Sequence, residues 1–169
     1  MSQSRPSRAL LIVNTDFHGS GGDPVPGRRR GAKREAEKLS QMLSKLNYEV
    51  TLRLNQTAKE MEDLYQRERG HQHGDFFVSI ISSHGEDGVV LGCDSEPLKL
   101  ARIFQLLSSE EFPGLTRIPK IFFIQACRGG ELDHGVAVEC DSGEPEPDGF
   151  SDYLAIPPQS AVMFSCSPG

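Results

Sequence analysis

The apolar residues of this chain fall into short runs that are separated by stretches of helical periodicity. The run at residues 10–13 does not alternate between apolar and polar positions, which is typical of a strand that is buried on both faces. Five strands are predicted, at residues 10–13, 48–54, 76–84, 121–127 and 161–164.

Three stretches between these strands have apolar residues at helical spacing. The first gives a helix of about 15 residues and places one set of apolar side chains on a single face, namely Ala32, Ala36, Leu39, Leu43 and Leu46. The second begins at a capping box over residues 57–60 and should bury Met61, Leu64 and Tyr65. The third has Leu100, Ile103, Phe104 and Leu107 on one face. Repeated strand–helix units predict an α/β fold with a mostly parallel β-sheet flanked by helices.

Other segments are expected to lie outside this framework. Residues 1–7 are rich in Ser, Arg and Pro and are expected to be disordered, and residues 18–30 form a Gly- and Pro-rich loop. A short hairpin is expected over residues 86–92. Residues 139–148 are acidic and contain a single apolar residue, so they cannot bury enough surface to order themselves and predict a mobile linker.

Two of the predicted strands end in residues that could act together as a nucleophile and its general base. Residues 121–124 lead into Gln125-Ala126-Cys127-Arg128-Gly129, and residues 76–83 lead into His84 and Gly85. Since open α/β sheets place their chemistry at the carboxyl ends of the strands, neighbouring strands would bring the imidazole to the thiol there. A free cysteine, with a pKa of about 8.5, is only a few per cent thiolate at neutral pH and needs such a base. A lone cysteine or histidine is more often structural, but the joint pattern predicts a Cys/His dyad.

These residues resemble the caspases. Q-A-C-[RQG]-G is a caspase signature with a histidine upstream, and here the segment from Gln125 to Gly129 fits it, with His84 standing 43 positions before Cys127. The resemblance implies that Cys127 attacks the scissile carbonyl and that His84 carries the proton to the leaving amine. The backbone N–H groups of Gly85 and Cys127 would hold the oxyanion.

The resemblance also assigns substrate-binding residues. Arg29 matches an arginine that lines the S1 pocket, where a guanidinium would bind an aspartate side chain with two hydrogen bonds, and Gln125 would add its amide. A slip of one residue would put Arg28 or Arg30 in the place of Arg29. The carbonyl of Gly27 would orient His84.

A processing site is expected in the acidic linker. The segment that ends at Asp141 resembles the site where a caspase separates its large and small subunits, with Asp133 and Asp148 as weaker alternatives. The implied regions are a large-subunit catalytic region at residues 8–130, an intersubunit linker at 131–157 and an incomplete start of the small subunit at 158–169. The caspase-like sheet would then be truncated after about its fifth strand.

The implied function is a cysteine endopeptidase that cleaves after aspartate in cytosolic proteins, acts in apoptosis or inflammation and is made as a zymogen. The absence of a long prodomain from this sequence favours an executioner-like member as an expectation, although a trimmed initiator would look the same. A small subunit and a homodimer are the partners expected of the complete protein, and other caspases or adaptors are further candidates. The chain alone is expected to be weak or inactive, because one arginine holds a carboxylate less firmly than two.

Composition limits the other classes of function. The formal net charge of −6 argues against a nucleic-acid or anionic-membrane surface. The four cysteines are widely spaced, which favours reduced thiols in the cytoplasm over disulfides or zinc. No cofactor or metal is expected, and His71 and His73 are interpreted as a solvated helix end.

Three alternatives stay open. The first is a catalytically inactive, caspase-like decoy that binds a partner caspase or adaptor as a dominant negative. The second, a nucleotide-binding α/β domain, lacks a phosphate-binding loop of the required spacing. The third, a related peptidase that cleaves after Arg or Lys, would need an acidic pocket, and Arg29 argues against it.

Overall fold

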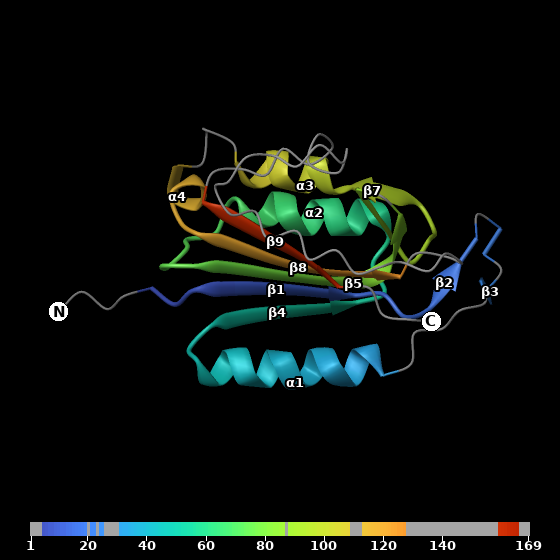
Figure 1. The fold of residues 1–169 in the computed structure, drawn as a ribbon, viewed down its shortest axis with the longest axis horizontal. Helices are drawn as coiled ribbons and strands as arrows, with labels where there is room; N and C mark the ends of the chain where they lie inside the picture. Colours follow the sequence, from blue (N-terminus) through green and yellow to red (C-terminus); the bar gives the residue numbers. More distant parts are fainter. Residues whose placement is uncertain are drawn as a thin grey trace.

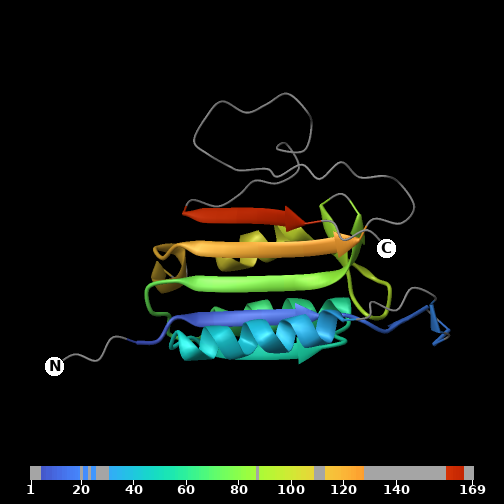
Figure 2. The same ribbon diagram turned by 60° about the horizontal axis from the view of Figure 1, so that its bottom comes forward.

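The computed structural model describes residues 5–19, 21–22, 24–25, 31–86, 88–108, 113–127 and 159–165. Seven of the described strands form one sheet, of which five are parallel and lie in the order β4, β1, β5, β8, β9 (Figure 2). These five are β1 (Arg8–Val13), β4 (Glu49–Leu54), β5 (Phe77–Glu86), β8 (Lys120–Cys127) and β9 (Ser160–Ser165). The predicted α/β fold with a mostly parallel sheet is confirmed.

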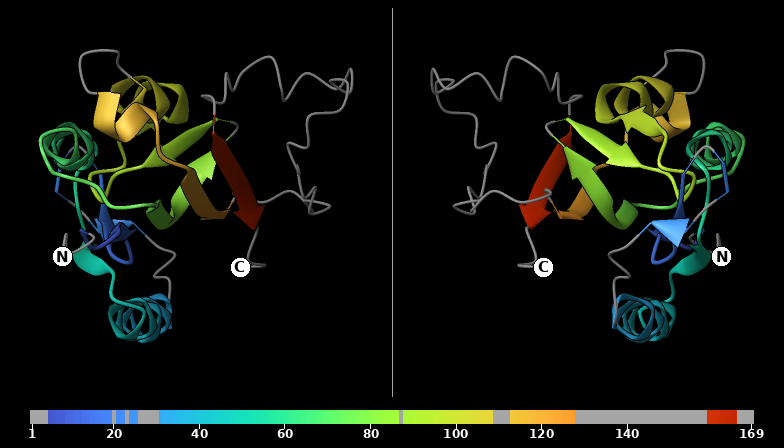
Figure 3. Two further views of the ribbon diagram at one scale, coloured as in Figure 1. Left: turned by 90° about the vertical axis from the view of Figure 1, so that its left-hand side faces the viewer. Right: turned by 90° about the vertical axis from the view of Figure 1, so that its right-hand side faces the viewer.

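Helices cover both faces of the sheet (Figures 1 and 3). On one face lies α1 (Ala32–Lys45), and on the other lie α2 (Ala58–Glu68), α3 (Leu100–Leu107) and the short α4 (Pro113–Thr116). Parallel neighbours in a sheet require a crossover connection, which is usually a helix. The helices therefore follow from the succession of strands and helices that the sequence predicts.

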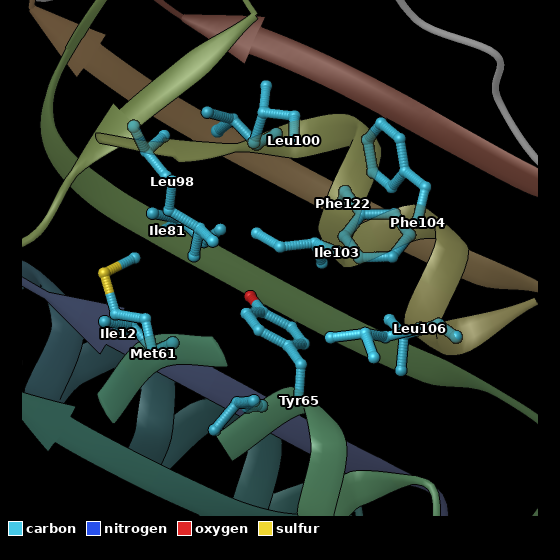
Figure 4. Packing of buried hydrophobic residues seen from close by; sticks show 14 of the residues in the cluster. Ile12, Met61, Tyr65, Ile81, Leu98, Leu100, Ile103, Phe104, Leu106 and Phe122 are labelled. Carbon is cyan, nitrogen blue, oxygen red and sulfur yellow. The ribbon is translucent and has the colours of Figure 1, made fainter. Parts of the chain in front are cut away.

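The larger hydrophobic core lies between the sheet and helices α2 and α3 (Figure 4). Met61 and Tyr65 of α2 are fully buried there, opposite Ile103 of α3. The Tyr65 hydroxyl forms a 2.6 Å hydrogen bond with Ser79 Oγ, which in turn donates to the Leu10 carbonyl at 3.1 Å. These two bonds satisfy the hydroxyl groups of Tyr65 and Ser79 within the core.

The other face of the sheet is covered less completely. Leu43 of α1 packs with Leu11 and Val78 of the sheet. Further along the sheet, Phe123 of β8 and Met163 of β9 are 41% and 42% exposed and stand opposite each other in the register of the two strands. Among the described residues, no helix covers this pair.

The sequence predicted most, but not all, of these elements. The capping box of α2 is confirmed, because Thr57 Oγ1 accepts from the Glu60 N–H at 3.1 Å and Glu60 Oε1 accepts from the Thr57 N–H at 3.4 Å. The apolar face predicted for α3 is buried. The prediction for Leu46 is wrong, since α1 ends at Lys45 and the Leu46 side chain is 62% exposed.

Short elements account for the remaining differences. The expected hairpin is present, because β5 continues past His84 to Glu86 and turns into the antiparallel β6 (Val89–Leu91). The sequence did not predict β7 (Pro97–Lys99), which pairs with β6, or the four-residue α4. Part of the loop expected at 18–30 is a small hairpin between β2 (Phe17–His18) and β3 (Pro24–Val25). Elements of two to four residues are too short to show a periodic pattern.

A buried charged cluster closes the amino-terminal end of the sheet. The Arg8 guanidinium donates to Glu68 Oε1 at 2.6 Å and lies 3.1 Å from Glu49 Oε2. His73 Nε2 lies 2.9 Å from Glu68 Oε1. The interpretation of His73 as part of a solvated helix end is therefore wrong, because its side chain is only 2% exposed.

Candidate active site

The carboxyl ends of β5 and β8 carry the two residues of the predicted dyad. In the parallel pairing of these strands, His84 and Cys127 are direct partners in the Cα register. The two long apolar runs form neighbouring parallel strands inside the sheet. Their register places His84 beside Cys127. The Cys127 side chain lies outside the described part of the chain, so its placement rests on the backbone of β8.

A buried polar cluster holds the strand ends just below His84. Asn14 follows β1 and is 0% exposed, and its backbone N–H donates to the Ser82 carbonyl at 2.8 Å. Its side-chain Nδ2 donates to Ser83 Oγ at 3.3 Å and to the Leu91 carbonyl at 3.1 Å. Its Oδ1 accepts from the Gln56 N–H at 2.8 Å. One amide side chain thus ties β1, β5, β6 and the segment after β4 together.

The His84 ring packs against an aromatic side chain from a different part of the chain. The ring centroids of Phe17 and His84 are 4.4 Å apart, with the planes tilted by 44°. Phe17 belongs to β2 and is only 6% exposed. This distance is close to the lower limit, about 4.5 Å, of favourable aromatic contacts.

Gln125 lies two residues before Cys127 on β8 and pairs with Ser82 of β5 in the register. The Ser82 hydroxyl donates to Gln125 Oε1 at 3.2 Å. That bond fixes the orientation of the amide, so the Nε2 group is directed away from Ser82. The predicted substrate-binding amide therefore lies on the strand of Cys127 and is held by Ser82 of the strand that carries His84.

Gly85 lies where two backbones approach closely. A Cβ atom on Gly85 would lie 2.5 Å from the Val89 carbonyl oxygen and 2.9 Å from the Ala126 Cβ atom. The hairpin from β5 to β6 thus requires glycine directly after His84. The predicted use of the Gly85 N–H for an oxyanion stays a prediction.

Several predicted residues lie outside the described part of the chain. Arg29, its alternatives Arg28 and Arg30, and the orienting carbonyl of Gly27 belong to this group. The processing residue Asp141 and its alternatives Asp133 and Asp148 belong to it as well.

Cys93 is the second cysteine that the structure places, and its environment is unlike that of a nucleophile. It is 6% exposed, and burial, together with the charges of Asp94 and Glu60, raises the pKa of its thiol. Among the described residues, no group of three His, Cys, Asp or Glu side chains could hold a metal ion. No helix within that same part is long and apolar enough to cross a membrane.

Comparison with known proteins identifies the family. The family model described as the caspase domain matches residues 6–169. The chain belongs to the caspase family. Caspase a of Danio rerio is 32% identical over 175 residues, covering 97% of this chain and 44% of the relative. Caspase-3 of Bos taurus is 32% identical over 162 residues, covering 95% of this chain and 56% of the relative.

The match to these caspases is partial in length. Caspase-10 of Homo sapiens is 34% identical over 138 residues, which are 80% of this chain and 26% of that relative. The chain spans about half, or less, of the length of the curated caspases that it matches.

Three residues around the predicted dyad were not found from the sequence of this caspase-family chain. Asn14 stands directly after a buried strand, which is a recognisable position for a site residue. Ser82 could have been found from the strand pairing alone, since alternation puts it on the face of His84. Phe17 gave no signal, because its contact with His84 depends on the short β2–β3 hairpin.

Proposed function

We propose that this caspase-family chain carries the catalytic centre of a cysteine endopeptidase that cleaves after aspartate. Cys127 is the nucleophile and His84 carries the proton. The observation that supports this most strongly is the Cα register, which pairs the two residues at the carboxyl ends of adjacent parallel strands. Membership of the caspase family supports the same assignment.

The reaction proceeds through a thioester. Cys127 passes its proton to His84, and its sulfur attacks the main-chain carbonyl carbon of the substrate aspartate. The C–N bond breaks as His84 gives the proton to the leaving amine. Water, deprotonated by His84, then hydrolyses the thioester and restores the thiol. The N–H groups of Gly85 and Cys127 hold the oxyanion in both tetrahedral states.

Specificity for aspartate comes from donors beside the nucleophile. With its Oε1 bonded to Ser82, Gln125 can direct its Nε2 donor at a substrate carboxylate. Arg29 supplies a planar guanidinium that binds the same carboxylate with two parallel hydrogen bonds. An uncharged asparagine in the substrate would lose the charge-assisted part of both contacts.

The chain is made as a zymogen that is cleaved after Asp141, and it acts on cytoplasmic proteins in apoptosis or inflammation. A small subunit and a second copy complete the active assembly. The names of the relatives include several caspases, among them caspase-3 and caspase-10, so the executioner-like subtype remains a proposal.

Intact-mass analysis with an electrophilic peptide probe tests the proposal. The purified chain is mixed with a probe that carries aspartate at the recognition position and, separately, with a twin that carries asparagine. We expect one adduct with the aspartate probe, much less with the asparagine twin, and none in Cys127→Ala. Equal labelling by both probes would contradict the aspartate pocket.

The decoy alternative makes the opposite prediction in the same experiment. A folded chain that forms no adduct with either probe would favour a non-catalytic binding module for this chain by itself, without the small subunit and second copy. Far-ultraviolet circular dichroism and a cooperative unfolding transition establish that the chain tested is folded.

A further inference from the structure

We propose that Phe17 is a positioning residue for His84, holding the imidazole in the orientation from which it exchanges a proton with Cys127. The inference rests on the proposed function and adds to it a residue outside the dyad and the substrate pocket. The observation that carries it is the ring contact between Phe17 and His84, at 4.4 Å between centroids.

Packing against a neighbouring ring restricts the orientation of the His84 imidazole. Rotation about the bond from Cβ to an aromatic ring has broad minima, so a histidine ring turns readily unless it is packed. The His84 side chain is half-buried at the end of β5, where the sheet gives way to the hairpin. The Phe17 ring lies against it and restricts that rotation.

Phe17 is itself held firmly enough to act as a support. On its amino-terminal side, Asn55 Oδ1 accepts from the backbone N–H groups of Thr15 and Asp16 at 2.9 and 3.1 Å. On its carboxyl-terminal side, the His18 N–H donates to the Cys93 carbonyl at 2.8 Å. The residues before and after Phe17 are thus bonded to two separate segments of the fold.

A further contact secures the same strand. Ser95 Oγ donates to the His18 carbonyl at 2.9 Å, and Phe17 pairs with Val25 across the β2–β3 hairpin. A side chain whose backbone is bonded on both sides, and which is itself 6% exposed, has little freedom to move away from His84. The arrangement therefore holds an aromatic ring, tilted by 44°, against the His84 imidazole.

The pH profile of Cys127 alkylation tests this role. An aligned imidazole keeps the thiol reactive below its ordinary pKa of about 8.5, whereas an unaided thiol reacts only as it ionises. We expect Phe17→Leu to lower the rate constant for iodoacetamide at neutral pH about tenfold, a fraction of the 10²–10⁴ that a positioned acid–base group contributes. The rate at high pH should not change. Phe17→Tyr keeps the ring and should retain the wild-type profile.

Phe104→Leu is the matched control. Phe104 is 1% exposed and contacts Phe122 at 5.0 Å between ring centroids, in the core on α3. The variant makes the same change in a buried ring that does not contact His84. Digestion and mass analysis report the modification of Cys127 separately from that of the other three cysteines, Cys93, Cys140 and Cys166.

Each other outcome overturns the inference. If Phe17→Leu and Phe104→Leu slow alkylation equally, general destabilisation explains the effect. If Phe17→Leu keeps the wild-type profile while His84→Ala loses the reactivity at neutral pH, the dyad stands and the role of Phe17 is wrong. If His84→Ala also keeps the wild-type profile, the proposed dyad fails together with the inference.

Discussion

Replacing Glu68 by Gln should destabilise this protein far more than the same change at an exposed position of the same helix. Glu68 is the last residue of α2 and is 4% exposed. Its carboxylate forms hydrogen bonds with both Arg8 and His73. Burial would raise the pKa of the Glu68 carboxyl, but the hydrogen bonds from His73 and Arg8 and the charge of Arg8 hold that pKa below its usual value. The carboxylate is therefore charged in the folded protein at neutral pH.

The structure sets the size of the effect. Removing one partner of a buried ion pair costs about 3–5 kcal/mol, because the other charge is left buried without compensation. Arg8 keeps a second carboxylate, Glu49, at 3.1 Å, although that side chain is 61% exposed. We therefore expect Glu68→Gln to lower the free energy of unfolding by about 3 kcal/mol, at the low end of that range.

Glu62→Gln is the matched control. Glu62 lies on the same helix and pairs with Arg102 at 2.8 Å, but these side chains are 34% and 46% exposed. An exposed pair of this kind contributes about 0–1 kcal/mol. Urea unfolding at neutral pH gives both free-energy differences by linear extrapolation.

The pH dependence of the effect has a definite sign. Because the folded-state pKa of Glu68 is lowered, its contribution is complete above the unfolded-state pKa of about 4.3 and is lost as the pH falls through the folded-state pKa. The difference in free energy of unfolding between the wild type and Glu68→Gln should be constant near neutral pH and should decrease at acidic pH. A difference of less than about 1 kcal/mol at neutral pH, equal to that of an exposed pair, would refute the reasoning.

Three further predictions follow from other buried groups. Lys120→Met should lower the free energy of unfolding by about 2 kcal/mol, because Lys120 Nζ donates to three backbone carbonyls at 3.0 to 3.3 Å. Urea unfolding measures this difference. The same substitution at Lys38, which is exposed, should have no comparable effect. Gly85→Ala should lower the rate of Cys127 alkylation at neutral pH, because the new Cβ would lie 2.5 Å from the Val89 carbonyl oxygen and must displace backbone at the end of β5. An unchanged rate would contradict this reasoning. Cys93 should be alkylated more slowly than Cys127 in the folded chain and at a comparable rate in urea, since burial raises the pKa of its thiol; mass analysis of digested peptides distinguishes the two.

The elements that the sequence predicted well are those with long, regular patterns. Strand β1 is buried along its whole length, as its unbroken apolar run predicts. The residues of α2 and α3 that were expected inside are buried or nearly so, because two or three helical turns give a clear period. The level ends of β5 and β8 follow from the same patterns and are the basis of the candidate site.

The parts that could not be predicted depend on contacts between distant residues. The buried position of His73 follows from its contact with Glu68 and from the ring of Phe77, 5.6 Å away between centroids. The position of Phe17 follows from the hydrogen bonds that its neighbours Asp16 and His18 make to Asn55 and Cys93, which are far away in the sequence. Such contacts have no local periodicity, so a single sequence does not reveal them.

The rate at which the aspartate probe labels Cys127 in three proteins tests the central claim most directly. The proteins are the wild type, His84→Ala and His71→Ala, the last removing an exposed histidine from the segment between α2 and the start of β5. If His84 and Cys127 form the catalytic pair, His84→Ala should slow labelling at neutral pH by about 10²-fold or more, and His71→Ala should label at the wild-type rate. Equal rates in the wild type and His84→Ala, with both proteins folded, would contradict the claim that the two strand ends form a catalytic dyad.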